Sequence, residues 1–173
     1  GDPDHLGWVG RVCTAATGRG HDATGYNLGI RRDTSADVRG RWATEARARL
    51  PDGSPRLLVF SFGVNDAVME DGRRRVAPED TIAHARAILE EACRVAPCLF
   101  VGPPPTAESE LNARVSLIDA DLAALCRETG VPFLSVFAPL HALPAWREAA
   151  AAGDGAHPGR DGYAALAAQV DGW

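Results

Sequence analysis

The feature of this chain that most restricts its fold is an alternation of short, apolar, strand-like runs with longer segments of helical period. Such alternation is typical of parallel strands joined by crossover helices. We expect four strands, at residues 23–30, 56–62, 98–102 and 132–137. Residues 56–62 form a nearly continuous apolar run, which predicts a central strand covered on both faces.

Apolar residues recur at steps of three and four between these runs, which predicts amphipathic helices. The segment 108–128 carries such a stripe, and Pro78 followed by two acids marks the start of an earlier helix. Thr34 and Asp37 fit a capping box that opens another helix. Two further helices are expected, at residues 6–17 and 159–170.

The length and net charge of the chain argue against several classes of function. With 173 residues the chain has the length of one domain, and we expect a single domain over 1–173. The net charge of -5 and the scattered basic residues argue against nucleic acid as a partner. No apolar run approaches the roughly 20 residues needed to span a bilayer. We therefore expect no membrane span, and the sequence leaves the oligomeric state open.

The cysteines indicate free thiols rather than a metal site. Cys13, Cys93, Cys98 and Cys126 form no C-x-x-C pair and have no histidine at ligand spacing, which argues against zinc. Buried, unpaired thiols are typical of a reducing compartment. We expect no metal, and we expect a cytoplasmic protein.

Asp154 and His157, just before the last expected helix, are the strongest candidates for chemistry. A carboxylate three residues before a histidine can hold one ring nitrogen protonated and orient the imidazole as a general base. The alternative is that Asp154 only forms a turn with the flanking glycines. The other four histidines, His5, His21, His84 and His141, are expected to be structural or solvated.

Gly29 lies at the carboxyl end of the expected strand 23–30, and Asn65 lies just after the expected strand 56–62. The carboxyl ends of strands form the edge of an open α/β sheet where ligands bind. A glycine lets its backbone N–H approach a ligand, and an asparagine amide adds an uncharged donor. The alternative is an ordinary turn, since Gly, Asn and Asp are turn formers.

Three blocks occur in one order along the chain: Asn27-Leu28-Gly29, Gly63-Val64-Asn65-Asp66, and Asp154 with His157. Together they resemble the SGNH, or GDSL-type, family of esterases and lipases. The resemblance implies a three-layer α/β/α, flavodoxin-like, doubly wound parallel sheet and hydrolysis of a small-molecule carboxylic ester without a cofactor. It also implies a catalytic role for Asp154 and His157, and an oxyanion hole formed by Gly29 and Asn65.

The chain departs from the family at its first block, a strand that ends in Gly-Asp-Ser and carries the nucleophile. Gly1-Asp2-Pro3 has no hydroxyl at the third position, and the segment Gly1 to Arg11 resembles instead the stretch directly after the nucleophile. Ser54, Ser61 and Ser109 do not sit on a strand-to-helix turn beside glycine. We therefore leave the nucleophile unassigned within the chain and expect it, with the first strand, upstream of residue 1.

Two other classes of function compete. A non-catalytic binding domain on the same fold is expected if no serine precedes Gly1. A phosphate-binding, flavodoxin-like domain is disfavoured because no glycine-rich phosphate loop opens a helix. Arg31 and Arg32, directly after Gly29, either contact an anionic group of the substrate or remain solvated or paired with local carboxylates.

Overall fold

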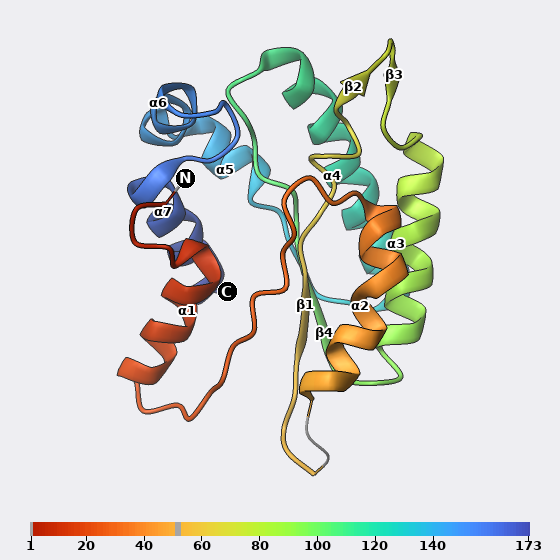
Figure 1. Ribbon diagram of the computed structural model, residues 1–173, viewed down its shortest axis with the longest axis vertical. Coiled ribbons are helices and arrows are strands. Elements are labelled where there is room, and N and C mark those ends of the chain that lie inside the picture. The colour runs from red at the N-terminus through yellow and green to blue at the C-terminus, as the bar shows by residue number, and fades with distance from the viewer. Residues whose placement is uncertain (1, 51–52) are drawn as a thin grey trace. The chain divides into compact units, whose positions relative to one another are not determined.

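A computed structural model describes residues 2–50 and 53–173 as a mixed α/β structure (Figure 1). The described residues group into two compact units. The first unit comprises residues 2–27, 104–112 and 136–173, and the second comprises the described residues of 28–103 and 113–135. Each unit is considered separately.

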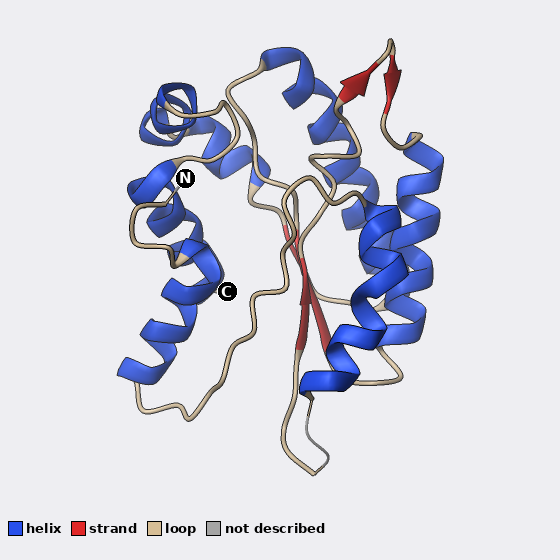
Figure 2. Cartoon of the chain, in the orientation of Figure 1, coloured by secondary structure: helices blue, strands red, loops and turns tan. Residues whose placement is uncertain are grey.

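The second unit contains a parallel sheet, red in Figure 2, of β1 (Leu58–Phe60), β4 (Cys98–Val101) and β5 (Phe133–Leu134) in the order β1-β4-β5. Leu58 lies opposite Cys98, and Phe100 lies opposite Phe133. Sequential parallel strands joined by crossovers are the expected arrangement, and the α/β class with a parallel sheet is confirmed.

Three helices accompany this sheet: α2 (Ser35–Arg49), α3 (Pro78–Ala92) and α4 (Ser109–Thr129). The first two run side by side in Figure 1. The expected capping box is present, because the Thr34 side chain accepts from the Asp37 backbone and the Asp37 carboxylate accepts from the Thr34 N–H. Local sequence signals thus place the start of α2 correctly.

Aromatic side chains form much of the core of this unit. Trp42 packs edge-on against Phe60, with ring centroids 5.6 Å apart. Phe62 packs edge-on against Phe100 at 5.0 Å, and Phe100 stacks on Phe133 at 5.7 Å. Edge-to-face and offset contacts at these separations add to the hydrophobic gain from burial. The aromatic contacts link α2 with all three parallel strands.

The sequence did not lead us to expect the hairpin formed by β2 (Met69–Glu70) and β3 (Arg73–Arg74). Its turn consists of Asp71 and Gly72, both with positive φ, 51° and 75°. Such a two-residue turn matches the twist of antiparallel strands, and an Asp-Gly pair favours it.

The first unit is helical, with α1 (Gly7–Gly18), α5 (Phe137–Ala142), α6 (Pro144–Ala152) and α7 (Gly159–Asp171). In it, α1 packs against α7 (Figure 1), and Arg19 donates two hydrogen bonds to Asp171, of 2.7 and 2.6 Å. Trp146 of α6 is fully buried and donates from Nε1 to the carbonyl of Pro105 at 3.0 Å.

Several expected strands were wrong in extent or kind. Residues 23–30 have no regular secondary structure, and residues 56–62 and 132–137 shorten to β1 and β5, with Phe137 opening α5 instead. A strand exists through hydrogen bonds to a neighbour, and within the described residues the segment 23–30 has no strand partner. The strand-like composition of residues 23–30 was therefore not sufficient to predict a strand.

The expected central strand lies at an edge. Among the described residues β1 pairs only with β4; its residue Val59 is 44 % exposed, and the preceding Leu57 is 50 % exposed. An apolar strand at an edge presents unpaired N–H and C=O groups to any further strand.

Within the described part of the chain, no helix is both long and apolar enough to cross a membrane.

One buried carboxyl stands out in the second unit. Asp119 of α4 is 8 % exposed, and its Oδ2 accepts a hydrogen bond of 2.6 Å from the Ser135 hydroxyl. Its Oδ1 is buried without a hydrogen-bond partner in the described structure, close against Gly102, where any Cβ would collide with it. Burial raises the pKa of Asp119, and the Ser135 hydrogen bond opposes that rise in part.

We predict that Asp119→Asn stabilises the protein near neutral pH, by about 1 kcal/mol, because an amide removes a confined charge. The folded-state pKa lies above its ordinary value of 3.8, so the stabilising contribution of the acid is complete below pH 3.8 and is lost as the pH rises through the folded-state pKa. Urea unfolding should show a larger gain at pH 8 than at pH 4. The exposed Asp121→Asn on the same helix is the control, and an equal gain in both variants would contradict the assignment.

Candidate active site

The loop between α6 and α7 brings Asp154 and His157 together. Nδ1 of His157 donates to Oδ2 of Asp154 at 2.7 Å, and Oδ1 of Asp154 accepts from the backbone N–H groups of Ala156 and His157, at 3.1 and 3.0 Å. The loop is fixed by backbone hydrogen bonds, including Gly155 N–H to the carbonyl of Ala150 at 3.0 Å. Gly155 has φ of 85°, a value that favours glycine.

These hydrogen bonds set the charge of Asp154. Burial acts to raise the pKa of its carboxyl, but the His157 side chain and the two backbone N–H groups outweigh burial and hold the pKa well below its usual range. Asp154 is therefore ionised throughout the neutral range. With Nδ1 held as a donor to Asp154, the imidazole presents Nε2 as its basic nitrogen.

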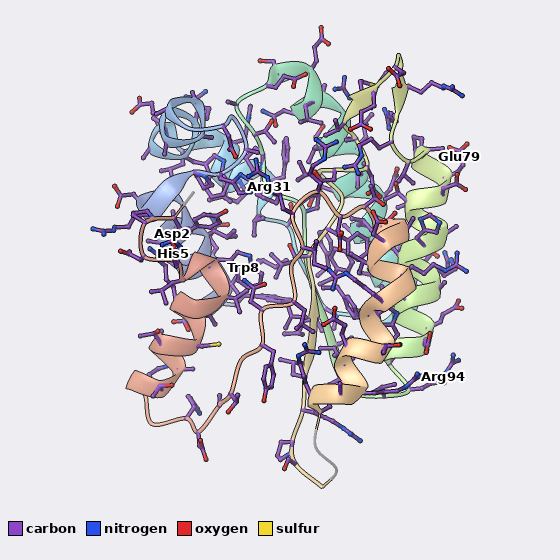
Figure 3. The ribbon with its side chains drawn as sticks, in the orientation of Figure 1. Asp2, His5, Trp8, Arg31, Glu79 and Arg94 are labelled. Carbon is purple, nitrogen blue, oxygen red and sulfur yellow. The ribbon has the colours of Figure 1, made fainter. Side chains whose placement is uncertain are left out.

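The segment that begins at Asp2 lies in the same unit as this loop. Asp2 accepts a 2.8 Å hydrogen bond from the Gly7 N–H at the start of α1 (Figure 3), and Asp4 accepts one of 2.6 Å from Arg160 of α7. Burial and the charges of Asp154 and Asp2 together raise the pKa of Tyr163. The phenol therefore stays neutral near pH 7.

A depression of about 490 Å³ lies where that segment meets the first turn of α7. Pro3 lines it on one side, and Pro158, directly after His157, lines it together with Gly159. The residues that come after the expected nucleophile block thus reach the start of α7, beside the histidine loop.

Gly29 and Asn65 belong to the second unit. The Asn65 side chain donates from Nδ2 to the carbonyl of Asp33 at 2.9 Å, and so holds the loop that carries Gly29. An amide nitrogen has two hydrogens, and the bond to Asp33 uses one. The second hydrogen does not take part in that bond.

A second contact anchors the Gly29 loop from the β2–β3 hairpin. Arg75 donates from Nη1 to the carbonyl of Arg32 at 2.9 Å, and the Arg32 guanidinium pairs with Glu70 of the hairpin. Arg32 has φ of 71°, which a non-glycine residue adopts only when its surroundings hold it there. Arg32 thus pairs with a local carboxylate, one of the two roles expected for it.

The neighbouring Asp66 is the residue whose role the sequence did not reveal. It is fully buried, and its carboxylate accepts from the Ser35 backbone N–H at 2.8 Å and from the Thr81 hydroxyl at 2.9 Å. Ser35 is the first residue of α2, so Asp66 binds the positive end of that helix. The Ser35 hydroxyl also hydrogen-bonds Nδ1 of His84 at 3.0 Å. Asp66 therefore fixes the backbone on which Asn65 lies.

Two of the four expected site residues lie in each unit. The first unit joins Asp154 to His157, and the second joins Asn65 to the loop of Gly29. Convergence of the two pairs on one substrate stays a prediction. Among the described residues no group of three or more His, Cys, Asp or Glu side chains could hold a metal ion.

Comparison with known proteins gives a consistent result. The model of the GDSL-like Lipase/Acylhydrolase family matches residues 1–165. No curated protein is similar enough to match the chain.

Solved structures of similar fold include three hydrolases. A lipase/acylhydrolase from Enterococcus faecalis is 20% identical with a TM-score of 0.75, covering 95% of this chain and 82% of its own. An acetylxylan esterase from Geobacillus stearothermophilus is 20% identical with a TM-score of 0.76, and the match covers 95% of this chain and 78% of the esterase. A psychrotrophic esterase from Pseudoalteromonas, inhibited by monoethylphosphonate, is 14% identical with a TM-score of 0.72. That match covers 97% of this chain and 85% of the esterase. At these identities the likeness concerns the fold.

We predict that Asp66→Ala lowers the free energy of unfolding by about 2–4 kcal/mol, because two buried donors, the Ser35 N–H and the Thr81 hydroxyl, lose their acceptor. Thr81→Val should cost less, since it removes one of the two bonds. Urea denaturation measures both. The exposed Asp121→Ala should change the value by no more than about 0.5 kcal/mol, and a similar loss in that variant and in Asp66→Ala would refute the anchoring role.

Proposed function

This chain belongs to the GDSL-like lipase/acylhydrolase family, whose members are ester hydrolases, and we propose that it hydrolyses small-molecule carboxylic esters through a Ser-His-Asp triad. The observation that carries the proposal is the 2.7 Å hydrogen bond between Nδ1 of His157 and Asp154. It fixes the tautomer that a general base requires and places an ionised carboxylate where an imidazolium would form.

The proposed reaction has two steps of acyl transfer. A serine Oγ attacks the ester carbonyl while Nε2 of His157 takes the hydroxyl proton, and that proton then leaves with the alcohol. Water, deprotonated by the same Nε2, next attacks the acyl-enzyme and releases the carboxylic acid and the free serine. Asp154 stays ionised throughout and stabilises the imidazolium.

Gly29 and Asn65 are the proposed oxyanion donors. Both groups are uncharged, and the negative oxygen of the tetrahedral intermediate would accept the Gly29 N–H and the second hydrogen of Asn65 Nδ2. The bond from Asn65 to the Asp33 carbonyl supports this role, because it orients the amide and ties it to the loop of Gly29. The donors would thus be held in place before the charge develops.

We place the nucleophile on a strand upstream of residue 1 that pairs with the open edge of β1. The exposed Val59 and the pairing of β1 with β4 alone among the described strands support this position. A parallel strand there would end at the same sheet edge as β1, close to Gly63.

A fluorophosphonate probe and a p-nitrophenyl ester test the whole proposal on the polypeptide that includes the upstream residues. One labelled serine ahead of Gly1, together with ester turnover, is expected. A polypeptide that binds esters without labelling or turnover would instead be a binding domain.

We predict that His157→Ala lowers kcat by about 10³-fold or more in that polypeptide, because the serine loses its base. Rates of p-nitrophenyl acetate hydrolysis measure the loss. His21→Ala, at an exposed position outside the proposed site, should leave the rate unchanged. Full turnover without the imidazole of His157 would end the proposed mechanism.

We predict that Asn65→Ala lowers kcat by about 10²–10³-fold with little change in KM, because the amide acts on the charge that develops in the transition state. Its thermal midpoint should fall by only a few degrees, since one hydrogen bond to the Asp33 carbonyl is lost. A rise in KM at constant kcat would instead assign Asn65 to ground-state binding.

A further inference from the structure

The connection from β4 to α4 contacts the histidine loop through a backbone hydrogen bond. Residues 104–112 of this connection belong to the first unit, and the connection, green in Figure 1, runs beside α6 before α4 begins. The N–H of Ala107 donates to the carbonyl of Gly155 at 2.8 Å. Gly155 lies between Asp154 and His157, so this hydrogen bond reaches the loop that carries both side chains.

The peptide group between Gly155 and Ala156, which we call the loop peptide, is held on both sides. Its carbonyl oxygen, on Gly155, accepts from Ala107. Its N–H, on Ala156, donates to Oδ1 of Asp154 at 3.1 Å. In a planar trans peptide the C=O and N–H bonds point in opposite directions, so fixing one also fixes the other. The bond from Ala107 therefore sets the direction of the N–H that holds the Asp154 carboxylate.

Asn112, in the first turn of α4, holds the residue before Ala107. Its Oδ1 accepts from the backbone N–H of Thr106 at 2.7 Å and from the Thr106 hydroxyl at 3.1 Å. Its Nδ2 donates at 2.8 Å to the carbonyl of Thr106, which belongs to the peptide group between Thr106 and Ala107, the support peptide. Asn112 and Thr106 are both buried, so water does not compete for these bonds.

The support peptide and the loop peptide lie in one chain of hydrogen bonds. Asn112 donates to the carbonyl of the support peptide, whose N–H donates to the carbonyl of the loop peptide. The N–H of the loop peptide donates to Asp154. Every donor points toward the carboxylate, and each bond in such a chain polarises and strengthens the next. Loss of the Asn112 amide would therefore weaken the bond that ends on Asp154.

Hydrogen bonds, rather than side-chain packing, fix the backbone at Ala107. The Ala107 side chain is exposed, so burial does not hold it in place. On the other side of Thr106, the fully buried Trp146 of α6 donates from Nε1 to the carbonyl of Pro105 at 3.0 Å. Asn112 and Trp146 together therefore determine where the Ala107 N–H points.

We propose that Asn112 is a positioning residue for Asp154 and His157, acting through the support peptide and the loop peptide. The chain of bonds keeps Oδ1 of Asp154 in place, and so keeps Oδ2 in line with Nδ1 of His157. Asn112 acts on the reacting atoms only through the backbone. The role in catalysis rests on the proposed function, whereas the effect on the hydrogen bond between Asp154 and His157 does not.

The kinetic test uses Asn112→Ala and Ala107→Pro, which removes the N–H of the support peptide, in the polypeptide that includes the upstream residues. In each variant kcat for p-nitrophenyl acetate should fall about 10-fold at unchanged KM, because the base is misplaced. The double variant should lose no more than the weaker of the two single variants, because both changes break the same chain. Losses that multiply, or no loss in Asn112→Ala, would overturn the proposal.

Leu125→Ala separates positioning from a general loss of stability. Leu125 is buried on the same helix as Asn112, beyond the residues of the first unit. Its thermal midpoint should fall at least as far as that of Asn112→Ala, while its kcat stays at the wild-type value. An equal loss of kcat in Leu125→Ala would refute the positioning role. If Ala107→Pro does not fold, the comparison of Asn112→Ala with Leu125→Ala decides.

A second measurement does not depend on ester hydrolysis. The ¹⁵N chemical shifts of the neutral His157 imidazole report which ring nitrogen carries the proton, and the wild type should carry it on Nδ1. In Asn112→Ala part of the population should move to the tautomer protonated on Nε2, and an unchanged ratio would overturn the proposal. A polypeptide that shows this change but hydrolyses no ester would refute the proposed function and still support the positioning role.

Discussion

The buried carboxylate of Asp66 is the interaction on which the rest of the second unit depends. It binds the first N–H of α2 and the hydroxyl of Thr81 in α3, and so joins two helices to the turn after β1. A carboxylate so deeply buried persists only when donors satisfy it, and both donors come from helices distant in the sequence. The backbone beside Asn65 therefore has one stable arrangement.

Local signals predicted helices α1, α2, α3, α4 and α7, and strands that depend on distant partners were harder to predict. Thr34 and Asp37 determine the start of α2 through groups three residues apart, and the sequence shows both. The run 23–30 has strand-like composition but no strand partner among the described residues. The hairpin was not predicted, although Asp71-Gly72 is a turn signal, because its strands are only two residues long.

The same distinction applies to the candidate site. Asp154 lies three residues from His157, and the hydrogen bond that their spacing implied is present. Asp66 has the composition of a turn residue, but its partners lie 31 and 15 residues away, so only the folded chain reveals its role. The catalytic roles of His157, Asp154, Gly29 and Asn65 remain proposals, as do a single domain and a cytoplasmic location.

The loop that carries Gly29 is held by hydrogen bonds to its backbone carbonyl groups. Asn65 binds the carbonyl of Asp33, and Arg75 binds that of Arg32, so both contacts recognise main chain. Every amino acid offers the same carbonyl. Exposed positions such as Ile30 can therefore change without altering these contacts, so the proposed donor role of Gly29 would be separable from the choice of acyl group.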